Sequence, residues 1–516
     1  VLAITAWDTF RLWKKRSRLG HRAVVRALLV LAVGVGHALA SPDDGLLASI
    51  AAVAVVGPIF FESLLAKGTN SKETFVTGVP GIRTYGSLKQ FDRPLLTVSE
   101  IVILLGAGTA WAGAGPLPWL ICALVLDALY LVLTVAAFVR IRRNAEARTN
   151  LHDAIVAYQP EFYIYTSRPD DASYQVMMWL PYLARTEKKF ATITRNNVPA
   201  RALSELTDAP IITCPKSADL EKTLVPSLGA VFYVNASSRN GEMIRHLEYT
   251  HVYLGHGDSD KPPSYNPTHA MYNRIFAAGQ AATERYGAHG VTISPEKFEI
   301  VGRPQLESVE VTTELPAEGS STVLYAPTWR GHVDETMLHS LPVAPQMITE
   351  LIRRGMKVVF RPHPFSYEFE EDAETIRQIQ EMLEEDRLRS GRQHVFGEAA
   401  EKDMDVIECM NLSDAMISDV SSVVSDYLYS GKPFAMTAVS AQGDDFIEQY
   451  PIARASYVLN GDLSNLDEVL NALLETDPER KNRLKYRSFY LGDFPDDGYA
   501  ENFVSAAARM VSEAPS

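Results

Sequence analysis

Cysteine is nearly absent from this sequence. Its 516 residues include three, Cys122, Cys214 and Cys409, which lie far apart and show no paired spacing. This scarcity excludes a zinc site built from cysteine pairs, and it fits a chain exposed to a reducing cytosol. No internal repeat or low-complexity segment stands out either.

Positive charge is scarce after residue 150. That part holds 33 Lys and Arg against 54 Asp and Glu, whereas residues 1–150 hold 16 against 9, so a basic front part precedes an acidic back part. A surface that binds nucleic acid must be basic, because it neutralises phosphates. We therefore expect no nucleic-acid partner. The length suggests roughly three domain-sized units.

Long apolar runs are missing from the back part, but the front part holds four. They cover about residues 24–40, 45–66, 95–114 and 117–139, and each is about long enough, at roughly 20 residues, to cross a bilayer. We predict a helical membrane domain of about four spans over residues 1–150. The alternative, a cleaved signal followed by buried core helices, lacks a small-residue cleavage site with a mature domain behind it.

The distribution of lysine and arginine predicts the orientation of these spans. Basic residues cluster before the first span, in the loop after the second and after the fourth, whereas the short loops 40–44 and 113–118 have none. Because Lys and Arg are retained on the cytoplasmic side, everything after residue 150 should be cytoplasmic in a multi-pass protein of the cell membrane. Of the acids near the spans, Glu62 and Glu100 can lie at the interface, and we interpret Asp127 as a helix–helix contact rather than part of an ion path.

From residue 151 onward, short apolar runs alternate with amphipathic segments, as is typical of stacked β–α units. One series covers residues 151–315 and another covers residues 316–516, with the polar stretch 312–321 as a linker. We predict an α/β fold of two doubly wound domains with a cleft between them. The expected strands are 162–166, 191–194, 210–213, 230–234, 251–254, 274–277, 299–301, 322–325, 357–361, 415–418 and 433–437. The expected helices are 175–184, 241–247, 280–289, 345–353, 370–387, 422–430 and 466–475.

Four short polar segments follow predicted strands in the back part. They are His256-Gly257-Asp258-Ser259-Asp260-Lys261, Tyr325-Ala326-Pro327-Thr328-Trp329-Arg330, Arg361-Pro362-His363-Pro364 and Ser418-Asp419-Val420-Ser421-Ser422. Open α/β sheets bind their ligands outside the ends of their strands. The recurrence of such segments therefore indicates a phosphate-handling site more strongly than any one of them.

His256 is a candidate general base. Gly255 and Gly257 flank it, so the backbone can turn sharply and leave the imidazole projecting from a strand end. A histidine in this position can accept a proton near neutral pH. The alternative is a structural histidine bonded to a backbone carbonyl, but the polar run of residues 258–261 beside it favours a site.

The third and fourth segments are suited to phosphate. Prolines stiffen the turn that carries Arg361 and His363, and a guanidinium beside an imidazole can bind phosphate oxygens. The N–H groups and helix dipole after Asp419 form an anion site, to which Ser421 and Ser422 add hydroxyls. The alternatives are an ordinary turn with surface cations and a simple helix N-cap. In the second segment Thr328 could also donate to phosphate, whereas a Trp such as Trp329 is more often core.

Together the four segments resemble the CDP-glycerol glycerophosphotransferase family, the teichoic acid primases and polymerases. Members carry His-Gly-Thr-Pro-Leu-Lys, Tyr-Ala-Pro-Thr-Trp-Arg, Arg-Pro-His-Pro and Asp-Tyr-Ser-Ser segments in this order. Residues 325–330 and 361–364 match fully, and residues 419–422 match apart from Val420. The first segment departs most, because residues 258–260 replace Thr-Pro-Leu.

The resemblance implies a GT-B fold, in which two Rossmann-like domains face each other across a cleft, with the nucleotide donor mainly on the second. It also implies roles for the residues of the four segments. The expected site residues are His256 and His363 for catalysis, Arg361, Thr328, Asp419, Ser421 and Ser422 for the donor, and Asp258, Asp260 and Lys261 for the acceptor loop.

These observations predict a membrane-anchored transferase that moves glycerol phosphate from CDP-glycerol, or ribitol phosphate from CDP-ribitol, to a hydroxyl of a lipid-linked cell-wall acceptor and releases CMP. Two alternatives stay open: a GT-B glycosyltransferase that uses a nucleotide sugar, and a non-catalytic membrane assembly protein. No cofactor is required by the pattern. Asp258, Asp260 and Asp419 could hold Mg²⁺, but no ligand spacing demands a metal.

Overall fold

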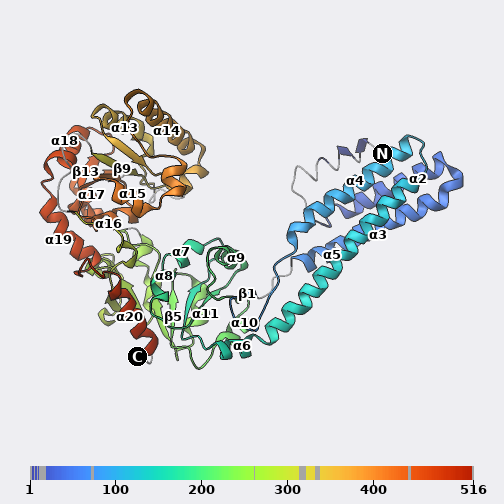
Figure 1. Ribbon diagram of the computed structural model, residues 1–516, viewed down its shortest axis with the longest axis horizontal. Coiled ribbons are helices and arrows are strands. Elements are labelled where there is room, and N and C mark those ends of the chain that lie inside the picture. Colours follow the sequence, from blue (N-terminus) through green and yellow to red (C-terminus); the bar gives the residue numbers. More distant parts are fainter. Residues whose placement is uncertain are drawn as a thin grey trace. The chain divides into compact units, whose positions relative to one another are not determined.

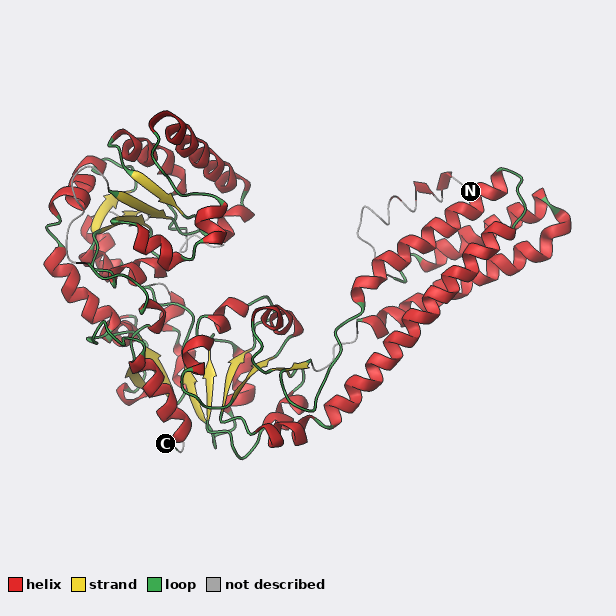
Figure 2. Cartoon of the chain, in the orientation of Figure 1, coloured by secondary structure: helices red, strands yellow, loops and turns green. Residues whose placement is uncertain are grey.

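The computed structural model describes residues 19–70, 75–260, 262–312, 321–331, 337–439 and 443–513, together with residues 3, 4, 6, 7 and 10. The chain forms two compact units (Figures 1 and 2). Unit 1 comprises residues 1–159, 169–171 and 191–226, and unit 2 comprises residues 160–168, 172–190 and 227–516. Most of the predicted linker, residues 313–320, lies outside the described residues.

Unit 1 contains four long apolar helices. They are α2 (Ala23–Ala40), α3 (Gly45–Thr69), α4 (Asp92–Trp111) and α5 (Leu117–Thr149). By length and composition each could cross a membrane, and each overlaps one of the predicted apolar runs, although α5 continues beyond the predicted end at residue 139. Their facing sides pack around Val55, Ile103 and Leu126, whereas Leu131 and many other apolar side chains point outward.

A buried ionic cluster joins these four helices. Arg26 on α2 lies with its Nη1 2.5 Å from Glu62 Oε2 on α3, donates through Nη2 to Ser99 Oγ at 2.6 Å, and pairs through Nε with Glu100 on α4. Tyr130 on α5 donates to the other oxygen of Glu62. Glu62 and Glu100 are thus buried beside the arginine within unit 1, and their position at the membrane interface stays a prediction. Asp127 is partly exposed on α5.

The loop between α3 and α4 adds a strand to the α/β part of unit 1. Strand β1 (Val76–Thr77) pairs antiparallel with β4 (Ile211–Thr213), which pairs in parallel with β3 (Phe190–Thr194). The same loop is bonded to α5, where Asn144 accepts from Tyr85 N at 2.8 Å and donates to Tyr85 O at 3.0 Å. Strand β1 was not predicted, because two residues carry no alternating pattern.

The first sheet of unit 2 consists of five parallel strands in the order β2-β5-β6-β7-β8. Their bounds are Phe162–Thr166, Ala230–Tyr233, Thr250–Tyr253, Arg274–Ala277 and Phe298–Ile300. Strands β2, β5 and β6 are buried along their whole length, as expected for strands covered on both faces. The helices on these connections are α7 (Ser173–Met177), α8 (Leu180–Ala184), α11 (Gly241–Ile244) and α12 (Gln280–Ala288).

The second sheet of unit 2 is also parallel and has the order β10-β9-β11-β12-β13. The strand bounds, from β9 to β13, are Thr322–Ala326, Lys357–Phe360, Ala415–Ser418, Phe434–Ala438 and Tyr457–Asn460. Strand β10 pairs with one edge of β9, and the next strand in the chain, β11, pairs with the other edge, so the strand order reverses at β9. Such a switch point, at the carboxyl ends of the strands, is where open sheets bind ligands.

Helices complete the second half of unit 2. They are α13 (Ala344–Arg353), α14 (Glu370–Ser390), α15 (Val406–Leu412), α16 (Ser422–Leu428), α17 (Gly443–Gln449), α18 (Leu466–Asn471), α19 (Arg480–Leu491) and α20 (Glu501–Ser512). The last helix, α20, packs against α8 and β6, so the carboxyl-terminal segment returns to the first sheet.

Unit 2 thus has two open parallel sheets, and the predicted α/β fold of two Rossmann-like domains in a GT-B arrangement is confirmed. The predicted helix 175–184 is instead two short helices, because Pro181 in the first turn of α8 lacks an N–H. The domain boundaries 1–150, 151–315 and 316–516 remain predictions.

Candidate active site

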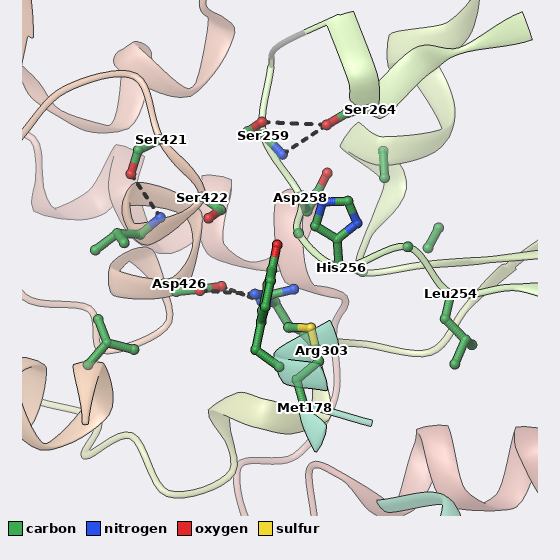
Figure 3. Close-up of a pocket in the computed structure, with 18 of the residues that line it drawn as sticks. Met178, Leu254, His256, Asp258, Ser259, Ser264, Arg303, Ser421, Ser422 and Asp426 are labelled. Carbon is green, nitrogen blue, oxygen red and sulfur yellow. Dashed lines mark hydrogen bonds and ion pairs between the residues drawn. The ribbon is translucent and has the colours of Figure 1, made fainter. Parts of the chain in front are cut away.

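A cavity of about 580 Å³ in unit 2 brings the four predicted segments together. The first sheet contributes the loop after β6, and the second sheet contributes the loops after β9, β10 and β11. Figure 3 shows Ser421, Ser422 and Asp426 on one side of the cavity and His256 and Asp258 on the other. The predicted site residues that line it are His256, Asp258, Thr328, Arg361, His363, Ser421 and Ser422.

His256 is presented to the cavity by a tight turn. Gly255 has φ +69°, a conformation that favours glycine, and its carbonyl accepts a hydrogen bond from Trp179 Nε1 at 2.8 Å. The imidazole is exposed to the cavity, with the ring of Tyr174 edge-on at 6.5 Å. Desolvation by the surrounding protein lowers the pKa of His256, the charges of Arg168 and Arg303 add to the effect, and a hydrogen bond to the backbone of Val234 partly opposes it. At neutral pH the ring is therefore uncharged and can accept a proton.

Two aspartates of the first segment bind one arginine. Arg285 on α12 lies with its Nη1 2.5 Å from Asp258 Oδ1 and donates through Nε to Asp260 Oδ1 at 2.9 Å. Asp258 faces the cavity, but Asp260 does not line it, because its Oδ2 accepts from Tyr490 Oη at 3.2 Å and Ile452 N at 3.3 Å. Asp260 therefore stabilises the loop through contacts outside the cavity. Lys261 lies outside the described residues.

Arg303 and Asp426 form a second buried ion pair in the cavity wall. Arg303 follows β8, Asp426 is on α16, and the pair is bidentate, with Nη2 3.1 Å from Oδ2 and Nε bonded to Oδ1 (Figure 3). The pair joins the two sheets of unit 2 at the cavity. Sequence reasoning missed Arg303 and Arg285. The position of Arg303 directly after a predicted strand was the available signal for one of them.

The Arg-Pro-His-Pro turn holds both of its polar side chains in place. Arg361 donates through Nη1 to the carbonyls of Ala400 and Met404, the latter at 2.7 Å. His363 Nδ1 accepts from Phe365 N at 3.2 Å, so the proton of the neutral ring is on Nε2. Trp329 lies nearly parallel to the His363 ring, with centroids 6.1 Å apart. His363 is thus set up to donate a hydrogen bond rather than to accept a proton.

The loops after β9 and β11 are fastened to each other by Asp419. Its carboxylate is fully buried, and Oδ2 accepts from Thr328 N at 2.9 Å and Ser340 N at 3.1 Å. Asp419 does not line the cavity; the structure places it behind Thr328. A carboxylate here stabilises the loop that presents the threonine.

The two adjacent serines have different surroundings. Ser421 Oγ accepts from Val423 N at 3.1 Å, so this hydroxyl caps α16. Ser422 lies beside the histidine loop, since a Cβ built on Gly257 would be 3.7 Å from Ser422 Cβ. The two halves of the site therefore meet at Ser422.

The acidic residues considered for Mg²⁺ are engaged with protein groups. Asp258 and Asp260 bind Arg285, and Asp419 binds backbone N–H groups. Within the described ranges, no cluster of three or more His, Cys, Asp or Glu side chains could hold a metal ion.

The second sheet matches a known family. Residues 303–458 match the family described as CDP-Glycerol:Poly(glycerophosphate) glycerophosphotransferase. The matched stretch starts at Arg303 and contains the second, third and fourth segments, but not the His256 loop. The resemblance predicted from the motifs is thereby confirmed. No curated protein matches the chain.

Several solved structures are similar to the chain. The wall teichoic acid polymerase TagF with CDPG has 13% identity and a TM-score of 0.43, with 72% of this chain and 94% of that one covered. A putative UDP-N-acetylglucosamine 2-epimerase from Listeria monocytogenes has 12% identity and a TM-score of 0.45 over 67% and 95% of the chains. The S. aureus MnaA–UDP structure has 11% identity and a TM-score of 0.45 over 69% and 98%.

Proposed function

We propose that this protein is a membrane-anchored transferase that moves glycerol phosphate from CDP-glycerol to a hydroxyl of a lipid-linked acceptor and releases CMP. The observation that carries the proposal is the shared cavity. His256 from the first sheet lies in it together with three segments of the family-matched second sheet. A candidate base and a set of groups that can donate hydrogen bonds to phosphate therefore face the same cavity.

The reaction is an in-line substitution at phosphorus. The oxygen of the acceptor hydroxyl attacks the β-phosphorus of CDP-glycerol, and an oxygen–phosphorus bond forms to give a glycerol phosphodiester. The bond from the β-phosphorus to the oxygen that bridges the two phosphates breaks, and CMP leaves with that oxygen. The acceptor proton passes to His256, whose lowered pKa keeps it neutral beforehand.

The remaining residues bind and orient the donor. His363 Nε2–H and the hydroxyls of Thr328 and Ser422 donate to diphosphate oxygens, while Arg361 adds positive charge held in place by its backbone partners. Positioning and electrostatic stabilisation of this kind supply most of the catalysis in phosphoryl transfer. Asp419 contributes by fixing the Thr328 loop.

The four apolar helices of unit 1 are compatible with a membrane anchor. In this proposal the basic flanks of the spans keep unit 2 in the cytoplasm, where CDP-activated donors are available, and the acceptor is carried on a lipid. The anchor and the lipid carrier would then confine enzyme and acceptor to the same membrane.

Nucleotide release from a panel of donors tests the proposal. Membranes with the full chain receive CDP-glycerol, CDP-ribitol or UDP-sugars together with lipid-linked acceptor. We expect CMP only from a CDP-alditol, and a fall in kcat of roughly 10²-fold or more for His256→Ala. His246→Ala, a histidine outside the cavity, is the matched control.

Other outcomes would reject specific parts of the proposal. Release of UDP would move the protein to the nucleotide-sugar transferases. Binding of CDP-glycerol without turnover would favour a non-catalytic assembly role. Full activity of His256→Ala would remove His256 as the base.

A further inference from the structure

A second cavity of about 390 Å³ lies in unit 2, between α12, the turn Pro451–Ala455 and α19. Arg285 is part of the wall of both cavities. One of its carboxylate partners, Asp258, lines the first cavity, and the other, Asp260, lines the second. The ion pairs of Arg285 therefore connect the second cavity to the loop that carries His256.

Three basic side chains, Arg285, Arg454 and Lys485, line this second cavity, against two acidic ones, Asp260 and Glu284. Arg454 and Lys485 are exposed there, and neither pairs with a carboxylate within the part of the chain that the structure describes. Arg285 is only 5% exposed, and its Nη2 is buried without a hydrogen-bond partner among the described residues. Glu284 is the opposing charge at the rim, and Asp260 is already paired.

Helix α19 contributes Lys485 to this cavity, and the helix as a whole is strongly basic. Its twelve residues contain five Lys and Arg and no acid, although the chain after residue 150 carries 21 more acidic than basic residues. Arg483 pairs with Asp477 and Arg487 pairs with Asp496, so two of the five basic residues of α19 form ion pairs within the protein. Lys485 has no such partner among the described residues, and it lies with Arg454 in the wall of one cavity, where two cations favour an anionic ligand.

Aromatic rings in the same cavity indicate a second chemical feature of the ligand. Tyr486 and Phe489 line the cavity, with their rings edge to face and 6.1 Å between centroids. Carbon skeletons pack on such rings, and guanidinium and ammonium groups bind phosphate oxygens through charge-assisted hydrogen bonds. The carboxylate of Glu284 can accept from hydroxyls. A phosphorylated polyol carries all three features.

We propose that the second cavity binds the polyol phosphate unit of the acceptor that precedes the attacking hydroxyl. The assignment rests on the proposed transferase function, and it makes Arg454, Lys485, Tyr486 and Phe489 the residues that select a phosphate-bearing acceptor. Arg285 then connects the bound acceptor to Asp258 in the first cavity, which holds His256 and is called the transfer cavity below.

Binding of a short glycerol phosphate oligomer tests the assignment independently of catalysis. The full chain in neutral detergent is titrated into a fluorescent oligomer, and anisotropy gives the Kd. Each lost charge-assisted contact should weaken binding roughly tenfold, so Arg454→Gln with Lys485→Gln should raise the Kd about 100-fold. Lys481→Gln is the matched control for the Lys485→Gln change, because it removes one lysine charge one turn earlier on α19, outside the cavity.

The same preparations are then assayed for CMP release with the oligomer as acceptor. The double variant should show a raised acceptor KM with the CDP-glycerol KM and kcat unchanged. An unaltered Kd in the double variant, or no oligomer binding by the unmutated chain, would overturn the assignment. Variant-sensitive binding without CMP release from any CDP-alditol would instead reject the transferase and keep the polyol phosphate site.

Lipid headgroups offer similar phosphate chemistry. Repeating the titration in nanodiscs of neutral lipid and of phosphatidylglycerol separates the two sources. A defect of the double variant that appears only with anionic lipid would overturn the assignment and make the cations a membrane contact. An equal rise in the Kd of the double variant in both kinds of nanodisc supports the assignment.

Discussion

Replacing Arg303 with leucine would leave the Asp426 carboxylate in the wall of the transfer cavity without its cation. The two side chains are 8% and 11% exposed, and they share two hydrogen bonds. Removing one partner of a buried pair costs about 3–5 kcal/mol, because the remaining charge stays desolvated. For a cooperative unit of roughly 300 residues, about 4 kcal/mol lowers Tm by about 6 °C.

The pH dependence of this loss identifies its cause. Burial already raises the pKa of Asp426, and the attraction of Arg303 opposes that rise. Without the arginine the folded-state pKa rises further above the unfolded value of about 3.9. The folded variant then binds a proton more tightly than the unfolded chain, so its stability is lost as pH rises through that pKa and recovers as pH falls.

Differential scanning fluorimetry of the full chain in detergent between pH 5 and 8 measures both effects. The double variant Arg303→Leu/Asp426→Leu should regain most of the lost Tm, since no unpaired charge is left. Arg185→Leu is the control, because its pairs with Glu307 and Glu501 are exposed and should contribute under about 1 kcal/mol. Additive losses in the double variant, or a deficit that does not change with pH, would refute the reasoning.

Two further predictions concern the site. Asp419→Ala should lower Tm and raise the donor KM, because two buried N–H groups, on Thr328 and Ser340, lose their acceptor at about 1–3 kcal/mol each; Asp419→Asn keeps an acceptor oxygen and should lose less. An unchanged Tm with equal loss of donor affinity in both variants would point to direct donor contact instead. The acid limb of kcat/KM should lie below the ordinary histidine value of about 6.5, since desolvation lowers the pKa of His256 and activity is lost only as pH falls through that value. A limb at or above 6.5 in the pH profile would contradict His256 as the base.

Much of the fold was predictable because buried parallel strands have a strong local signal. The bounds of β2, β7 and β11 agree with the apolar runs that predicted them. Strand β13, in contrast, is buried only at alternate residues, and α19 has so many basic residues that no apolar periodicity marks it as a helix. Packing against the rest of unit 2 decides these elements.

The sequence predicted which strand ends form the site, but it did not predict which side chains pair with each other there. Parallel strands bring His256 and Ser422 to one cavity, as the spacing of motifs and strands indicated. Whether a carboxylate faces ligand or protein depends on groups distant in sequence: Asp258 meets Arg285, and Asp419 meets Ser340. No pattern in the sequence encodes those pairings.

The short strand between the second and third apolar helices affects how this protein can be divided. A fragment that begins after residue 150 would lack β1, and the side of β4 that now pairs through Val76 and Ile212 would become a bare sheet edge. It would also lose Arg148, the ion-pair partner of Asp219. Unpaired edges recruit other copies of the same strand, so truncated soluble forms are expected to self-associate unless residues 75–88 are grafted back or β4 is given a charged, outward-facing side chain.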